Sequence, residues 1–165
     1  MPEFSLDTIA EVSVTLAGFS GLAAAFRTRP MRDWAEWERI WFWYIVTWSL
    51  GSLLFSLLPG VLGSLGVGLP AGWTLCAVFL ALFITAAVGL GARRSWRLYR
   101  LGVLHPGSSI VSAAPLSLLG AAAFLFLSLF GVGPPISGAY HLALFVTLGW
   151  ACGSFFLFLQ YPLSE

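Results

Sequence analysis

Two carboxylates and a hydroxyl recur along one face of the first apolar segment of the chain. Asp7, Glu11 and Thr15 are spaced by four residues, and Gly18 continues the same face if the segment is helical. Ionisable side chains inside a membrane usually face a bundle interior or a water-filled path. If several copies placed this helix around a common axis, the Glu11 carboxylates would form a ring, and such rings attract cations. The pattern predicts a pore or proton path lined by Asp7, Glu11, Thr15 and Gly18.

The same acids also have a purely structural interpretation. Glu3 and Asp7 would lie in the first turn of the helix, where negative charge is favourable beside the positive end of the helix dipole. Glu11 lies about two turns into the helix, so this explanation fits it less well. In a single chain, Glu11 could instead exchange a proton.

The composition places these residues in a membrane protein. The chain has 165 residues, of which 59% are hydrophobic and 9% are charged, and its mean hydropathy is +0.90. Soluble domains carry about 25% charged residues, because they need a solvated surface. The net charge of +1 gives no reason to expect nucleic acid as a partner. The lipid bilayer is therefore the first expected partner.

Four apolar runs are long enough to cross a bilayer core as helices, which takes about 20 residues. They lie at roughly 38–62, 71–92, 110–131 and 138–161. The segment 4–26 is less certain, because its charge-free part, 12–26, would make only about 22 Å of helix. We predict an all-α integral membrane protein in one domain, with five transmembrane helices: an acidic first helix and two helical hairpins. The alternative has four spans, with 4–26 lying along the cytoplasmic interface.

The breaks between these runs carry helix-end signals. Asp33 with Glu36 three residues later predicts a capping box, and Ser137 is a candidate N-cap. Two turns are rich in glycine and proline and share the order Val-Gly-x-Pro, then Gly, then an aromatic residue. They comprise Gly63, Gly66, Gly68 and Pro70 in one case, and Gly131, Gly133, Pro134 and Pro135 in the other. This weak repeat favours two parallel hairpins, an arrangement that some transporters use.

The basic residues predict the orientation. All eight are arginines, and they fall in two of the breaks: Arg27, Arg29, Arg32 and Arg39, then Arg93, Arg94, Arg97 and Arg100. Because Lys and Arg stay on the cytoplasmic side during insertion, both breaks are predicted to be cytoplasmic. The N-terminus would then lie outside and the C-terminus inside, in a bacterial inner membrane.

The arginines of the second group share a helix that we expect to continue beyond the membrane. Arg93, Arg97 and Arg100 lie on one face of it, which predicts contacts with anionic lipid headgroups. Pairing with the acids of the other cytoplasmic break is the alternative; these are Asp33, Glu36 and Glu38.

Stripes of small residues predict close helix packing. Ala17, Gly21 and Ala25 are spaced by four in the first segment, and Gly149 and Gly153 form a GxxxG pair in the last. Weaker stripes occur in the second and third runs, at Ser49, Ser52, Ser56 and Gly60 and at Ala77, Ala81, Thr85 and Gly89. Some of them can serve within the chain and others between chains, so self-association is expected.

The remaining reactive residues give no catalytic pattern. His105 and His141 are placed in loops on opposite sides of the membrane, and neither has a second metal ligand at helical spacing. Cys76 and Cys152 fall in different apolar runs at different depths, so we expect no disulfide between them. The aromatic ridge of the second run suits an interfacial belt and packing more than a bound quinone or pigment; it comprises Trp34, Trp37, Trp41, Tyr44 and Trp48. We therefore expect neither an enzyme nor a bound cofactor or metal.

The segment from Ile9 to Leu22 reads IAEVSVTLAGFSGL. It resembles the opening of small uncharacterised bacterial multi-pass membrane proteins, and this resemblance implies no activity. The resemblance favours an interpretation of Glu11 and the Ala-Gly-Phe-Ser-Gly run as one functional unit.

Three functions are compatible with these patterns. The first is a small homo-oligomeric channel lined by the acidic first helix, whose carboxylates would favour the passage of cations. The second is a non-catalytic accessory subunit that docks on a larger membrane complex through its small-residue stripes. The third is a small proton-coupled transporter in which Glu11 carries the proton.

Overall fold

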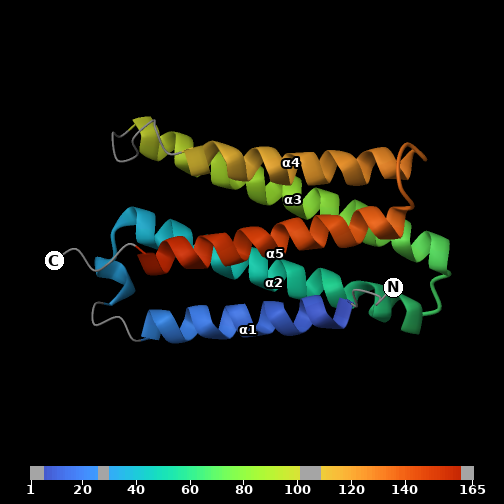
Figure 1. Cartoon of the computed structure of the whole chain (residues 1–165), viewed down its shortest axis with the longest axis horizontal. Helices are drawn as coiled ribbons and strands as arrows, with labels where there is room; N and C mark the ends of the chain where they lie inside the picture. Colours follow the sequence, from blue (N-terminus) through green and yellow to red (C-terminus); the bar gives the residue numbers. More distant parts are fainter. Residues whose placement is uncertain (1–5, 26–29, 101–108, 161–165) are drawn as a thin grey trace. The chain divides into compact units, whose positions relative to one another are not determined.

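The computed structural model describes residues 6–25, 30–100 and 109–160, and within these ranges it is helical without any strand. Its elements are α1 (Leu6–Ala25), the short 3-10 helix η1 (Met31–Asp33), α2 (Glu36–Ser64), α3 (Leu69–Arg100), α4 (Ser109–Leu129) and α5 (Ile136–Gln160). The prediction of an all-α chain with five long helices is confirmed, and Figure 1 shows their order along the chain.

Helix length and composition agree with a membrane protein. Four helices are long and apolar enough to cross a bilayer, within Leu6–Ala25, Glu38–Ser64, Pro70–Arg94 and Ile136–Leu159. In α4 the apolar part whose side chains are described is Pro115–Leu129, which is shorter, although the whole helix has 21 residues. The first segment therefore qualifies as a candidate span. Whether it crosses the bilayer or lies along it stays a prediction.

α2 begins differently from the expected capping box. The helix starts at Glu36, and the Glu38 carboxylate accepts a hydrogen bond of 2.8 Å from the backbone N–H of Ala35. Asp33 belongs instead to the preceding η1 turn. The predicted capping box of Asp33 and Glu36 is therefore wrong. The same three-residue spacing occurs two residues further on, where the Glu38 carboxylate binds the N–H of Ala35 and Ala35 has no side-chain oxygen to return the contact. Ser137 is likewise not an N-cap, because α5 already begins at Ile136.

The two glycine-rich turns end the helices before them in the same way. After α2, Gly66 has φ +79, and the N–H of Val67 donates to the carbonyl of Leu62 at 3.1 Å. After α4, Gly131 has φ +74, and the N–H of Val132 donates to the carbonyl of Leu127 at 3.1 Å. Both are Schellman caps, in which a left-handed glycine closes the helix. The weak sequence repeat thus corresponds to a repeated helix end.

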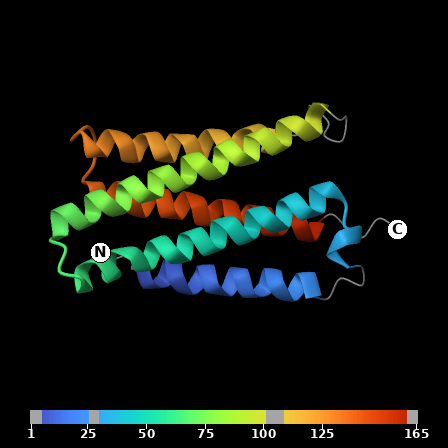
Figure 2. The ribbon, with the colours of Figure 1, turned by 180° about the vertical axis from the view of Figure 1, so that it is seen from behind.

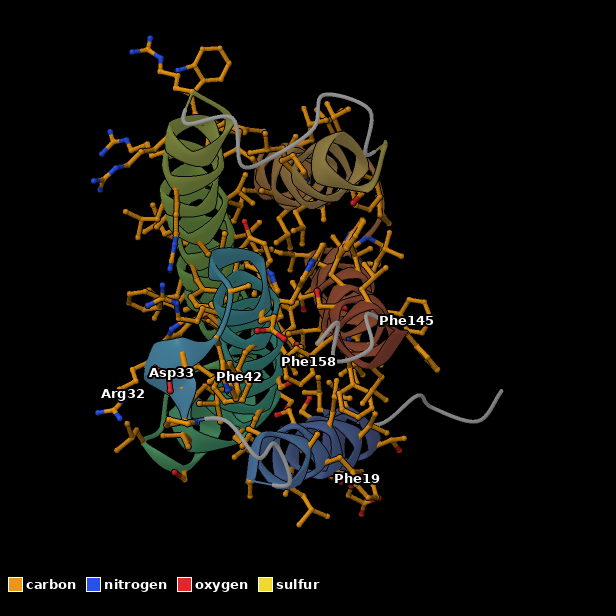
Figure 3. All side chains as sticks on the ribbon, turned by 90° about the vertical axis from the view of Figure 1, so that its left-hand side faces the viewer. Phe19, Arg32, Asp33, Phe42, Phe145 and Phe158 are labelled. Atoms are coloured by element: carbon orange, nitrogen blue, oxygen red, sulfur yellow. The ribbon has the colours of Figure 1, made fainter. Side chains whose placement is uncertain are left out.

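The chain divides into two compact units, Met1–Leu58 with Thr147–Glu165 (unit 1) and Pro59–Val146 (unit 2). Within unit 1, α1 lies along the first part of α2 and runs in the opposite direction, and the last part of α5 also runs opposite to α2 (Figures 1 and 2). Phe158 of α5 contacts Trp34 and Phe42, with ring centroids 5.9 and 6.2 Å apart. Figure 3 shows Phe42 and Phe158 directed toward each other.

The interior of unit 1 is rich in hydroxyl groups. Seven of its Ser and Thr residues are at most 3% exposed: Ser13, Ser20, Ser49, Ser52, Ser56, Thr147 and Ser154. We call this set the hydroxyl seam. Its members recur at spacings of three, four and seven residues, which place them on one face of each helix together with Ile9, Ile45 and Phe158. Ser52 of α2 and Thr147 of α5 are joined by a hydrogen bond of 3.0 Å.

Unit 2 has a more apolar interior, built mainly where α3 packs against α4. Cys76, Ala77, Leu80 and Ile84 of α3 are at most 1% exposed, as is Leu125 of α4. Near the start of α3, the Trp73 ring lies 5.7 Å from Tyr140 and 5.8 Å from His141, both from the first turns of α5.

Candidate functional site

The acidic face of α1 lies opposite its buried face. Ser13 and Ser20 are 0% exposed and Ile9 is 1% exposed. Ser20 follows Glu11 by nine residues, which is a rotation of about 180° around a helix. Asp7, Glu11, Thr15 and Gly18 are accordingly all exposed. The structure therefore brings the four predicted residues together on one face, and no other described part of unit 1 covers that face.

The Thr15 hydroxyl is partly engaged within the helix. Its Oγ1 donates a hydrogen bond of 2.8 Å to the backbone carbonyl of Glu11, one turn earlier. The oxygen lone pairs of Thr15 stay free to accept from water or to contact a cation. The face therefore presents carboxylate oxygens at Asp7 and Glu11 and a hydroxyl oxygen one turn further in.

The acidic face is flanked by both small and bulky side chains. Ala17 and Gly21 lie on one side, and a Cβ added at Gly21 would meet nothing within 4 Å. Val14 lies on that same side, three and seven residues from them, and is 53% exposed. Val12 and Phe19 lie on the other side and are 41% and 56% exposed. Figure 3 shows Phe19 pointing away from the rest of unit 1.

The remaining predicted packing residues are also open. Ala25 is exposed at the end of α1, and Gly149 is exposed on α5. Added Cβ atoms at Gly149 and Gly153 would meet nothing within 4 Å. These small residues therefore do not bring helices close together within unit 1.

The second arginine group lies at the end of α3, which continues to Arg100 as expected. Arg93, Arg97 and Arg100 are exposed, and the Arg100 guanidinium lies 5.8 Å from the centre of the exposed Trp96 ring. Of the acids considered as partners, Asp33 lies 3.5 Å from its neighbour Arg32 and Glu38 is buried. Arg27, Arg29 and Glu3 lie outside the described residues, as does the side chain of Glu36.

The other candidates have ordinary structural environments. Trp34 and Trp48 are 5% and 4% exposed, so this part of the aromatic ridge is packed inside unit 1. The His141 ring nitrogen Nδ1 lies 2.7 Å from the Ser137 carbonyl oxygen, while His105 lies outside the described residues. Cys76 and Cys152 are free thiols. Among the described residues, no group of three or more His, Cys, Asp or Glu side chains could hold a metal ion.

The hydroxyl seam was predicted only in part: the sequence indicates a packing stripe at Ser49, Ser52 and Ser56, which are buried, but its continuation in α1 and α5 was missed. A signal was present, because Ser13 and Ser20, Ser49 and Ser56, and Thr147 and Ser154 are pairs of hydroxyl residues seven apart. Seven residues are about two helical turns, so each pair lies on one face. The recurrence in three separate helices indicates a shared interior.

Searches against protein families, curated proteins and solved structures find no match to the chain. The class therefore rests on the chain itself: an all-α membrane protein with an acidic exposed helix face and a hydroxyl-rich interior in unit 1.

Proposed function

We propose that the chain assembles into a small homo-oligomeric membrane pore that conducts cations, with the acidic face of α1 lining the path. The observation that carries this proposal is the position of Asp7 and Glu11 on the side of α1 opposite its buried face. An ionised carboxylate facing lipid costs roughly 2.5–3.5 kcal/mol at mid-bilayer and less toward the interface, and Asp7 and Glu11 lie in the first two turns of α1. A water-filled path between copies removes that cost and gives the carboxylates a ring arrangement that favours cations.

The residues beside the acidic face support a closed ring. Gly21 leaves open space on one side of it, and Val12 and Phe19 are bulky and exposed on the other. Phe19 of one copy can pack against Gly21 of the next, because small residues let helices approach closely. Such a head-to-tail contact generates a ring when the rotation closes. In that ring Asp7, Glu11 and Thr15 face the common axis.

The proposed setting is the inner membrane of a bacterium, with the N-terminus outside and the C-terminus in the cytoplasm. The arginine groups support this orientation, since one lies around η1 and the start of α2 and the other at the end of α3. The exposed Arg93, Arg97 and Arg100 would contact the phosphates of anionic lipids on that side.

The direct test is conductance of the purified protein in planar bilayers under a potassium chloride gradient. The wild type is expected to conduct and to show a reversal potential on the cation-selective side. Glu11→Gln removes the charge and keeps the side-chain size, so it should lower the ratio of cation to anion permeability several-fold while the assembly keeps its mass.

Asp33→Asn is the matched control. Asp33 is an exposed carboxylate outside the candidate spans, and it lies beside Arg32. Its neutralisation should leave the reversal potential unchanged. A protein without conductance, or a Glu11→Gln variant with the selectivity of the wild type, would contradict the proposal.

An accessory subunit of a larger membrane complex is the second candidate. The observation that favours it is the open small-residue face at Gly149 and Gly153 on α5, which lies on a different helix from the acidic face. In this case Gly149→Leu should release the chain from its partner, and Glu11→Gln should not.

A further inference from the structure

Two hydroxyl oxygens of the seam are fully buried and have no hydrogen-bond partner among the described residues. These are the Oγ atoms of Ser13 in α1 and Ser49 in α2, and both residues are 0% exposed. By contrast, Ser20 donates to the carbonyl of Ala17 and Ser56 to the carbonyl of Leu53, each at 2.8 Å. Because buried hydroxyls almost always have a partner, the two exceptions require an explanation.

Ser13 and Ser49 lie at about the same height along the two antiparallel helices α1 and α2 of unit 1. α1 ends at Ala25 and α2 begins at Glu36, and Figure 1 shows these two ends on the same side of unit 1. Ser13 lies 12 residues before the end of α1, about 18 Å along its axis, and Ser49 lies 13 residues into α2, about 20 Å along its axis. Both side chains face the interior in which Ser52 and Thr147 form their hydrogen bond.

We propose that the interior of unit 1 contains a water-binding site between Ser13 and Ser49. A bound water donates to one hydroxyl and accepts from the other, so it can bridge oxygens up to about 5.6 Å apart. Ser52 and Thr147, at the neighbouring turn, supply further hydroxyl oxygens, and buried waters typically have about three polar partners. The bridge ties α1 to α2 and holds the rotation of α1. The site is independent of the pore, since it lies on the opposite side of α1 from Glu11.

Double-mutant cycles test whether Ser13 and Ser49 share a ligand. Unfolding is followed by tryptophan fluorescence in micelles with an increasing mole fraction of dodecyl sulfate. Ser13→Ala and Ser49→Ala should each lower the unfolding midpoint, and the double variant should fall no further than the more affected single variant. Removing either hydroxyl already releases the water, so the second removal adds little.

Two other pairs in the same seam serve as controls. Ser52→Ala with Thr147→Val removes a direct hydrogen bond and should show the same non-additivity. Ser20→Ala with Ser56→Ala removes two hydroxyls that each bind their own helix, so their shifts should add. Additive shifts at Ser13 and Ser49 would mean that each hydroxyl binds its own helix, and a raised midpoint would mean that neither is satisfied. Either result overturns the proposal.

A second measurement detects the water itself in the wild type. X-ray radiolysis produces hydroxyl radicals from bound water, and these label the adjacent side chains. Ile9 and Ile45 lie one turn before Ser13 and Ser49 and are 1% and 0% exposed. They should be labelled more than Leu80 and Ile84 of unit 2, which are equally buried. Equal labelling of all four would overturn the proposal even if the cycle shows coupling, because the two hydroxyls would then bond directly to each other.

Discussion

At the scale of single residues, α1 places its polar groups on two opposite sides. Ser13 and Ser20 point into unit 1, and Asp7 and Glu11 point away from it. The spacing of the acids predicts that they share a face, and this is confirmed. Which face is buried could not be predicted, because Val12, Phe19 and Leu22 are exposed while serines are buried. In a membrane helix, packing and hydrogen bonds select the inward face, and hydrophobicity does not.

Phe158 gives a prediction at this scale. Its side chain is 1% exposed and contacts both Trp34 and Phe42. Phe158→Ala should destabilise unit 1 by on the order of 2 kcal/mol, since it removes packing contacts and leaves a cavity. Unfolding in mixed micelles measures the change. Phe156→Ala is the control in the same helix, because Phe156 is 64% exposed. Equal effects of the two substitutions would contradict the packing described for unit 1.

At the scale of elements, the observed helices agree with the residue ranges predicted from the sequence, whereas some of the predicted helix ends do not. The predicted range 71–92 became α3 at Leu69–Arg100, and its extension to the second arginine group was expected. The start of α2 was misassigned, because Asp33 and Glu36 have the capping spacing but Ala35 and Glu38 make the contact. Side-chain capping spacings recur by chance, whereas a left-handed glycine is nearly obligatory in its turn. The glycine turns were therefore the more dependable signals.

Gly66 and Gly63 form a matched pair for testing these ends. Gly66→Ala places a Cβ on a residue with φ +79, which should destabilise the turn after α2 by about 1–2 kcal/mol. Gly63→Ala lies within the helix in open space and should be neutral or stabilising by up to about 1 kcal/mol. Thermal or detergent unfolding of the two variants separates these outcomes. A Gly66→Ala variant as stable as Gly63→Ala would show that the Schellman cap after α2 is not formed.

At the scale of the whole molecule, composition predicts the membrane setting and the arginine groups predict its orientation. Self-association depends on surfaces that a single chain leaves open, so the sequence indicates it only through its small-residue stripes, among them Gly21, Gly149 and Gly153. All three have open space where a Cβ would be. The ring of copies proposed above would cover Gly21 and the acidic face of α1 together.

The mass of the purified protein in a mild detergent, measured by native mass spectrometry, tests this central claim most directly. A ring of copies requires one defined assembly of four or more copies, at a multiple of 17.8 kDa. Gly21→Leu adds a bulky side chain where a Cβ meets nothing within 4 Å inside the chain, so it should disturb only the contact between copies and shift the assembly toward monomers. A wild-type monomer, alone or bound to other polypeptides, would contradict the pore, and the second of these results would make the chain an accessory subunit.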